Sequence, residues 1–128
     1  MLEYKQTEGQ DIAEVILHSI IVGQKFDNPG RGTSIICKKN NDCITYKRGK
    51  STINLKTADI VAAFKMFTGT ICRSVDLQQW RPQIFDSKKS GHSCNCTFLF
   101  LLLNYIGIIE GGIQGKGVRG NPYYVHMK

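Results

Sequence analysis

A chain of 128 residues is long enough for one ordinary domain, or for one domain with a small subdomain, and is too short for two full domains. Hydrophobic residues make up 41% of it and charged residues 21%, with only three prolines, which excludes a disordered chain and predicts a packed core. The net charge is +7, and the 114 residues after position 14 carry +10, so we expect a polyanionic partner, nucleic acid before an anionic membrane; a solubilising surface is the alternative.

The cysteines and the apolar runs bear on the cellular compartment. The five cysteines are odd in number and contain no C-x-x-C pair, and the polar, acidic N-terminus has no signal-peptide pattern. We therefore expect reduced thiols and a cytoplasmic protein. The longest unbroken apolar run, Phe98 to Leu103, is far shorter than the roughly 18 to 20 residues that cross a bilayer, so we expect no membrane partner.

Residues 1–56 predict a helix followed by a small antiparallel β-meander. Apolar residues recur at helical spacing from Ile12 to Phe26, so we expect an amphipathic helix over residues 10–26. Three extended segments with alternating or β-branched residues follow at 34–38, 44–47 and 52–55. The alternation predicts an inner face made of four apolar side chains, Ile44, Tyr46, Ile53 and Leu55.

The tip of this meander is basic. Lys47, Arg48 and Lys50 lie at or beside the turn between the last two strands, where their side chains can touch phosphates. A strand at the edge of a sheet can also carry lysine only to discourage aggregation, and that alternative stays open.

Residues 57–128 predict three helices, a short strand and a glycine-rich hairpin. Helix starts are indicated by the hydroxyl residues Thr57, Ser74 and Ser93, and helix ends by glycine. The expected elements are a helix over 58–67, a strand over 70–72, a helix over 74–82, a polar loop over 86–91, a helix over 93–106, and strands that begin at 108 and 123. Five glycines between Gly111 and Gly120 predict a mobile loop between the last two strands.

From Thr57 onward, the expected order of helix, strand, helix, helix, strand, loop and strand resembles a winged helix-turn-helix DNA-binding domain over about 70 residues. The resemblance implies that the third helix enters the major groove, that its first turn reads base edges, and that the hairpin, or wing, contacts the backbone or the minor groove. It places these residues on DNA: Lys88 and Lys89 in the loop before the helix, His92, Ser93, Asn95 and Thr97 at its start, and Lys116 and Arg119 in the wing.

The chemistry of the helix start suits DNA, but the rest of that helix does not. Asn95 can make a bidentate contact with adenine, and Ser93 and Thr97 can bond to bases or phosphates. Residues Phe98 to Leu103 depart from the pattern, because they are apolar on every side of the helix. Either only the first turn meets DNA, or another surface covers the helix, which can be the N-terminal helix and sheet or a second subunit.

Three motifs bear on metal binding, cofactor binding or catalysis. The H-x-C-x-C sequence at 92–96 lacks a fourth metal ligand at a usual spacing. The G-x-G-x-x-G sequence at 115–120 is followed by a strand, where a dinucleotide site needs a helix. The D-x-K sequence at 86–88 has no second acid before it on a strand, as a metal-dependent nuclease would need. We therefore expect no metal, no cofactor and no enzymatic activity.

The sequence thus predicts an α+β protein in which an N-terminal helix and antiparallel β-meander, residues 1–56, pack on a C-terminal winged helix, residues 57–128, with three helices and a β-hairpin wing. We expect one compact unit and a non-enzymatic DNA-binding protein, with duplex DNA as its partner and homodimerisation open. A regulator, or the DNA-targeting part of a restriction or mobile-element system, would fit. The alternatives are a protein–protein interaction module that uses the apolar last helix and, third, a metal-dependent nuclease.

Overall fold

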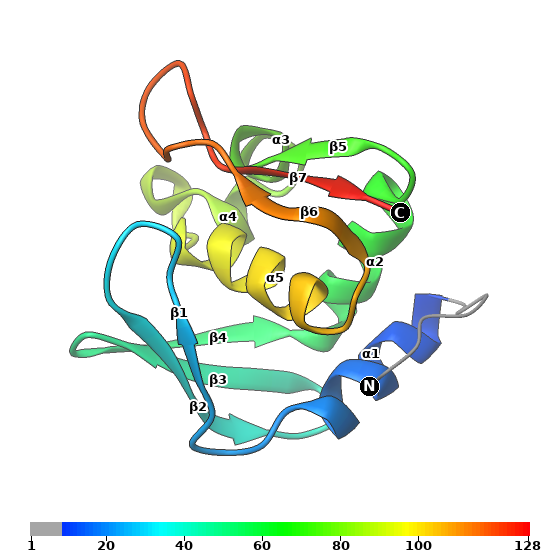
Figure 1. Cartoon of the computed structure of the whole chain (residues 1–128). Coiled ribbons are helices and arrows are strands. Elements are labelled where there is room, and N and C mark those ends of the chain that lie inside the picture. The colour runs from blue at the N-terminus through cyan, green and yellow to red at the C-terminus, as the bar shows by residue number, and fades with distance from the viewer. Residues whose placement is uncertain (1–8) are drawn as a thin grey trace.

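Helix α5 (Cys94–Tyr105) lies between two antiparallel β-sheets in the computed structural model, which describes residues 9–128, with side chains from residue 12 onward (Figure 1). The larger sheet has the strand order β1-β2-β3-β4, with β1 (Lys25–Asp27), β2 (Thr33–Lys39), β3 (Cys43–Arg48) and β4 (Ser51–Lys56). The smaller sheet has the order β5-β7-β6, with β5 (Ile71–Arg73), β6 (Ile109–Gln114) and β7 (Tyr124–Met127). The other helices are α1 (Gly9–Ser19), α2 (Thr57–Phe67), α3 (Ser74–Trp80), α4 (Pro82–Phe85) and the 3-10 helix η1 (Ser87–Lys89). The α+β class predicted from the sequence is confirmed.

The four-stranded sheet has the inner face that the sequence predicts. Ile44 and Tyr46 of β3 pair with Leu55 and Ile53 of β4, and all four side chains are buried. The period of two along a strand places these four side chains on one face, toward α5. The meander is therefore confirmed, and it gains a further strand, β1, from residues expected to be the end of a helix.

The helix predicted over residues 10–26 is wrong at its C-terminal end. The helix α1 ends at Ser19, Gly23 adopts a φ of +93°, and Phe26 lies on β1. The buried Phe26 keeps the apolar spacing of a helix although it belongs to the next element, which is why the pattern misled. Lys39 of β2 reaches back and donates two hydrogen bonds of 2.6 Å to carbonyl oxygens at the end of α1.

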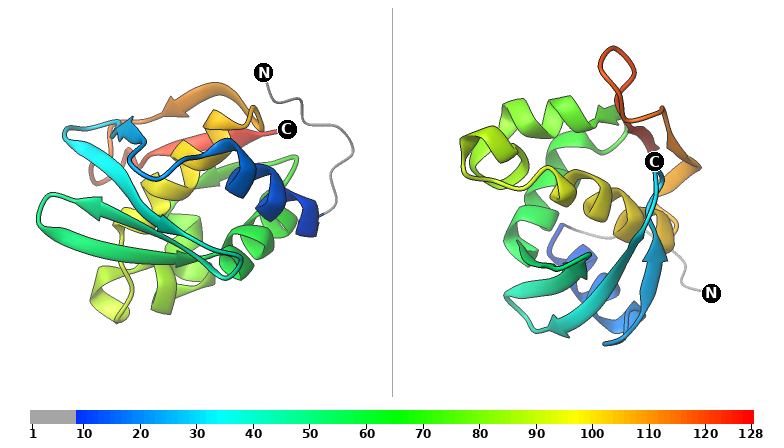
Figure 2. Two further views of the ribbon diagram at one scale, coloured as in Figure 1. Left: turned by 90° about the horizontal axis from the view of Figure 1, so that it is seen from below. Right: turned by 90° about the vertical axis from the view of Figure 1, so that its left-hand side faces the viewer.

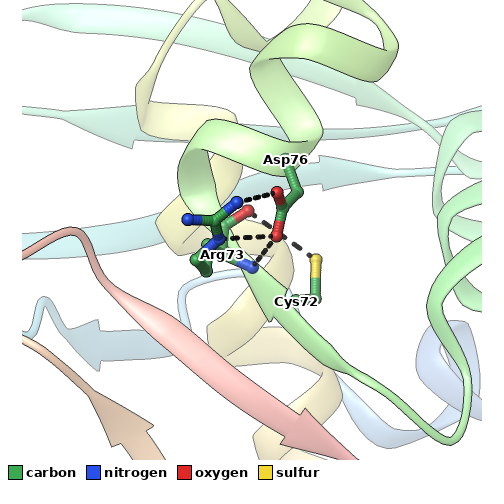
Figure 3. Close-up of polar contacts among 3 residues, drawn as sticks. All are labelled: Cys72, Arg73 and Asp76. Carbon is green, nitrogen blue, oxygen red and sulfur yellow. Dashed lines mark hydrogen bonds and ion pairs between the residues drawn. The ribbon is translucent and has the colours of Figure 1, made fainter.

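The three predicted helix-capping side chains do not cap. Thr57 and Ser74 are the first helical residues of α2 and α3, and Ser93 precedes α5 without a capping hydrogen bond. The Thr57 hydroxyl donates instead to a carbonyl oxygen of the β2–β3 turn, at 2.7 Å. At the start of α3, Asp76 accepts hydrogen bonds from the backbone N–H and the guanidinium of Arg73 (Figure 3). This carboxylate satisfies one backbone donor that the helix start would leave free.

From Asn95 to Leu103 the helix α5 is buried on all sides. Phe98, Phe100 and Leu102 are fully buried, and the ring of Tyr46 stacks on Phe98 from the four-stranded sheet. Figures 1 and 2 show this sheet on one side of α5 and the small sheet on the other. Of the covers that the sequence left open, the N-terminal sheet is therefore the one observed. Despite its apolar sequence, neither α5 nor any other helix among residues 9–128 is long and apolar enough to cross a membrane.

The strands β6 and β7 form the predicted hairpin, and β5 pairs with β7 to complete the small sheet. The wing, residues 115–123, projects from this sheet at the end where α3 begins (Figure 1). There the backbone N–H of Ser74 donates to the carbonyl oxygen of Tyr123 at 2.9 Å. Near the wing tip, Val118 and Asn121 form an antiparallel bridge. The wing therefore starts and ends beside α3.

Candidate functional site

A groove of about 410 Å³ lies between the wing, α3, the first turn of α5 and the end of β3. We call it the wing groove. Of the residues expected to contact DNA, it brings together four from three distant segments: Arg48, Ser93, Thr97 and Arg119. None of the residues that line it is acidic. The groove is therefore a place where an anion meets cations without an opposing carboxylate.

Two arginines give the wing groove its charge. Arg48 comes from the inner face of β3, and its Nη1 donates to Oγ1 of Thr97 at 3.3 Å. Arg119 is exposed at the wing. Among the side chains from residue 12 onward, no carboxylate forms an ion pair with either arginine. The first turn of α5 adds the positive end of a 12-residue helix to the same groove.

Ser93 connects the groove to the lysine-bearing loop. Its backbone N–H donates to Oγ of Ser87 at 2.9 Å, and the backbone N–H of Ser87 donates to Oγ of Ser93 at 3.3 Å. The two hydroxyls lie 3.0 Å apart in a further hydrogen bond. These bonds fix η1, and with it the exposed Lys88 and Lys89, beside the start of α5.

Asn95 does not reach the surface. It is 2% exposed, its Oδ1 accepts from the Tyr46 hydroxyl at 2.7 Å, and its Nδ2 donates to the carbonyl oxygen of Ile84 at 3.0 Å. Burial raises the pKa of Tyr46 above its ordinary value, so its hydroxyl remains a donor. The expected bidentate contact of Asn95 with adenine is corrected accordingly: both ends of this amide already have partners inside the protein.

The side chain of Thr97 also has partners inside the protein, although it borders the groove. It is 8% exposed, its Oγ1 donates to the carbonyl oxygen of Cys94 at 3.1 Å, and the same atom accepts from Arg48. Its hydroxyl therefore positions the guanidinium rather than a base. The contact with a base or a phosphate expected for Thr97 is corrected, because its hydroxyl already has a donor and an acceptor inside the protein.

The remaining residues expected on DNA are exposed, but none of them lines the groove. Lys47 follows the inward-facing Tyr46 and precedes Arg48, so strand alternation turns it to the outer face of the sheet. The others lie at the surface of turns or loops: Lys50 in the β3–β4 turn, Lys88 and Lys89 in η1, His92 before α5, and Lys116 in the wing. The structure thus sets two members of the predicted set apart from the other surface residues: Lys47 on the outer face of the sheet and the buried Asn95.

Glycines fix the path of the wing against Tyr123. Gly117 adopts a φ of +69°, and a Cβ at this position would lie 2.3 Å from the Tyr123 ring. A Cβ at Gly115 would lie 2.1 Å from the carbonyl oxygen of Pro122. On the other side, a Cβ at Gly30 in the β1–β2 loop would lie 2.8 Å from the Tyr123 hydroxyl. Close approach of the backbone to Pro122 and Tyr123 therefore explains Gly115 and Gly117.

The cysteines near the groove do not form a metal site. Cys96 is buried, and burial raises the pKa of its thiol to about 12. Its Sγ lies 3.7 Å from the carbonyl oxygen of Phe85, as a weak donor. Among the described residues, no group of three or more histidine, cysteine, aspartate or glutamate side chains is placed to hold a metal ion.

Among the groove residues that sequence reasoning did not assign, Gln78 and Tyr123 bring an amide and an aromatic ring. A signal existed only for Tyr123, an aromatic residue that follows a glycine-rich loop and Pro122. No family model, no curated protein and no solved structure matches this chain. The residues of the groove are therefore the basis on which its chemistry is assigned: it can bind an anion and can donate hydrogen bonds to it.

Proposed function

We propose that this protein is a non-enzymatic DNA-binding protein that contacts the phosphate backbone of a duplex through the wing groove and the cations around it. One observation carries the assignment: Arg48 and Arg119 meet the first turn of α5 in a groove with no acidic lining residue. Charge-assisted hydrogen bonds from arginine are among the strongest contacts that a phosphate can receive.

The order of the elements supports the assignment. Apart from the short α4 and η1, which come between α3 and α5, the elements from α2 to β7 follow the order that the resemblance to a winged helix requires, and the wing stands beside the groove. Because the four-stranded sheet covers α5, that helix is not available to lie in a major groove. Contact through the wing and the start of α5 is the mode that remains, and it favours backbone contacts over the reading of base edges.

Exposed cations extend the groove. Lys88 and Lys89 lie beside the start of α5, Lys116 lies in the wing, and Lys50 lies at the β3–β4 turn. Each phosphate neutralised by such a side chain releases condensed counterions, so affinity falls steeply as salt rises. This dependence separates DNA binding from a basic surface that only keeps the protein in solution.

Neither alternative function is favoured by a contact in the fold. An interaction module built on α5 would need a free apolar face, whereas Phe98 to Leu103 are each at most 9% exposed. A nuclease would need paired carboxylates to hold a cation, and in the part of the chain that the structure describes no group of three or more histidine, cysteine, aspartate or glutamate side chains is placed to do so. Cleavage of DNA that is abolished by EDTA would support the nuclease hypothesis.

The test is a fluorescence anisotropy titration of a labelled duplex at two salt concentrations. The variant Lys116→Glu with Arg119→Glu reverses the charge of the wing, and Lys65→Glu with Lys128→Glu changes the net charge equally near α2 and the C-terminus, away from the wing (Figure 1). We expect the wing variant to lose about tenfold or more in affinity and the control to lose little. Equal losses, or affinity that ignores salt, would refute DNA binding through the wing.

A further inference from the structure

The wing groove is shaped for more than a phosphate. Beside its arginines it has apolar and aromatic walls, provided by Val75, Val118 and Tyr123. Backbone phosphates alone need only cations on a surface, whereas a cavity of about 410 Å³ with apolar walls suits a flat group that must be desolvated. A nucleobase attached to its phosphate combines both properties.

A hydrogen-bonding amide points to the same ligand. Gln78 of α3 lines the groove, and its Nε2 makes only a long hydrogen bond of 3.5 Å to Oγ of Ser93. Within the described residues, its Oε1 accepts no hydrogen bond. A glutamine amide offers one acceptor and two donors, which match the edge of a base.

We infer that the wing groove receives one nucleotide whose base has left its stack, with the base against Tyr123 and Val75, its edge on Gln78, and its phosphate on the arginines. This rests on the proposed function in one respect, namely that the nucleotide belongs to a DNA strand. A free nucleoside monophosphate has the same chemistry and is the other possible source.

The burial of α5 explains why a base would bind outside its stack. Since α5 is buried under the four-stranded sheet, a base inside an intact duplex has no helix to read it. A base outside the stack can be read in a pocket, and extruding it costs least where it is unpaired. The protein therefore prefers DNA with an unpaired nucleotide to the same duplex fully paired.

The experiment compares the full chain on a fully paired duplex, on the same duplex with a one-nucleotide bulge, and on free deoxynucleoside monophosphates. We expect the bulged duplex to bind about tenfold more tightly than the paired one. Gln78→Leu reduces that ratio about fivefold, as the loss of one hydrogen bond predicts. Gln79→Leu, an exposed neighbour on the same helix, leaves it unchanged.

Val75→Phe provides a second variant, since it fills the groove without changing charge. It is expected to abolish the preference for the bulge while salt-dependent binding of paired duplex persists. Equal affinity for both duplexes in the unmodified protein overturns the nucleotide inference and leaves DNA binding intact. Binding of monophosphates without binding of either duplex supports the nucleotide chemistry and refutes the DNA function, and binding of none of the three refutes both.

Discussion

The ring of Tyr46 stacks on the ring of Phe98, with centroids 3.7 Å apart and an angle of 12° between the planes. This contact joins β3 to α5 across 52 positions of the sequence, and the Tyr46 hydroxyl extends it with a hydrogen bond to Asn95. Both rings are fully buried. The N-terminal sheet is thus part of the core that surrounds α5 rather than an addition to it.

Tyr46→Phe keeps the stacked ring and removes only the hydroxyl. The buried Oδ1 of Asn95 then loses its donor, so we expect the free energy of unfolding to fall by about 1–3 kcal/mol in urea titrations. Thr45→Val is the matched control, because Thr45 lies on the same strand as Tyr46 and its hydroxyl makes an exposed hydrogen bond to Asn54 of β4. Loss of that bond should lower the free energy of unfolding by less than about 0.5 kcal/mol. Equal losses of stability in the two variants would show that the buried hydrogen bond contributes no more than the exposed one.

Asp76→Ala removes the carboxylate that closes the start of α3 (Figure 3). We expect a loss of about 1 kcal/mol in stability at pH 7, typical for a helix-capping side chain. The hydrogen bond from the Arg73 side chain lowers the pKa of Asp76 in the folded protein, so its contribution is present above the ordinary aspartate pKa of 3.8 and is lost as the pH falls through the lowered value. Thermal unfolding of both proteins from pH 7 to pH 2 should therefore converge in acid; a difference that grows in acid would contradict this.

Gly117→Ala and Gly120→Ala separate steric contact from backbone strain in the wing. Both glycines have positive φ, at +69° and +82°, but only a Cβ at 117 meets a neighbour, the ring of Tyr123. Each substitution carries strain of about 1–2 kcal/mol, and Gly117→Ala also displaces the tyrosine. We expect only Gly117→Ala to shift the NMR signals of Tyr123. Similar shifts in both variants would mean that the ring does not support the wing.

We expect the cysteines to differ in their reaction with a thiol reagent, with the half-buried Cys43 and Cys94 between the two extremes. Cys37 is exposed, whereas Cys72 and Cys96 are buried, and burial raises the pKa of each of these two thiols to about 12. Because the thiolate is the reactive form, we expect Cys37 to react first at pH 8 and the buried pair to react only on unfolding. When the chromophore released by the thiol reagent is followed over time, the Cys37→Ser variant should lack the fast phase of the reaction. A fast phase that remains in the Cys37→Ser variant would mean that another cysteine is exposed to the reagent.

Much of the fold follows from local patterns. Alternation set the inner face of β3 and β4, and the all-round apolar character of α5 indicated that something covers it. The starts of α2, α3 and α5 lie within one residue of the predicted positions. The end of α1 and the partners of the hydroxyl groups at the helix starts were not predictable in this way, because contacts outside the local pattern decide them. The Thr57 hydroxyl, for instance, bonds a carbonyl 16 residues away, so its suitability as a cap goes unused.

The candidate site was predictable in its charges and not in its geometry. Lys88, Lys89 and Arg119 are exposed, as their loops suggested. Asn95 and Thr97 were expected at the surface, but their partners Tyr46 and Arg48 lie 49 residues earlier in the chain. A contact of that range leaves no trace in the spacing around a helix start, so sequence reasoning assigned to DNA two side chains that the sheet occupies.

Tyr123 is held between Gly117 of the wing and Gly30 of the β1–β2 loop. A hairpin transplanted from another protein onto β6 and β7 would therefore need a matching loop at position 30, nearly 90 residues earlier, to be held in the same way. A side chain at position 30 would displace the Tyr123 hydroxyl, so we expect a large residue there to be tolerated better when residue 123 is smaller.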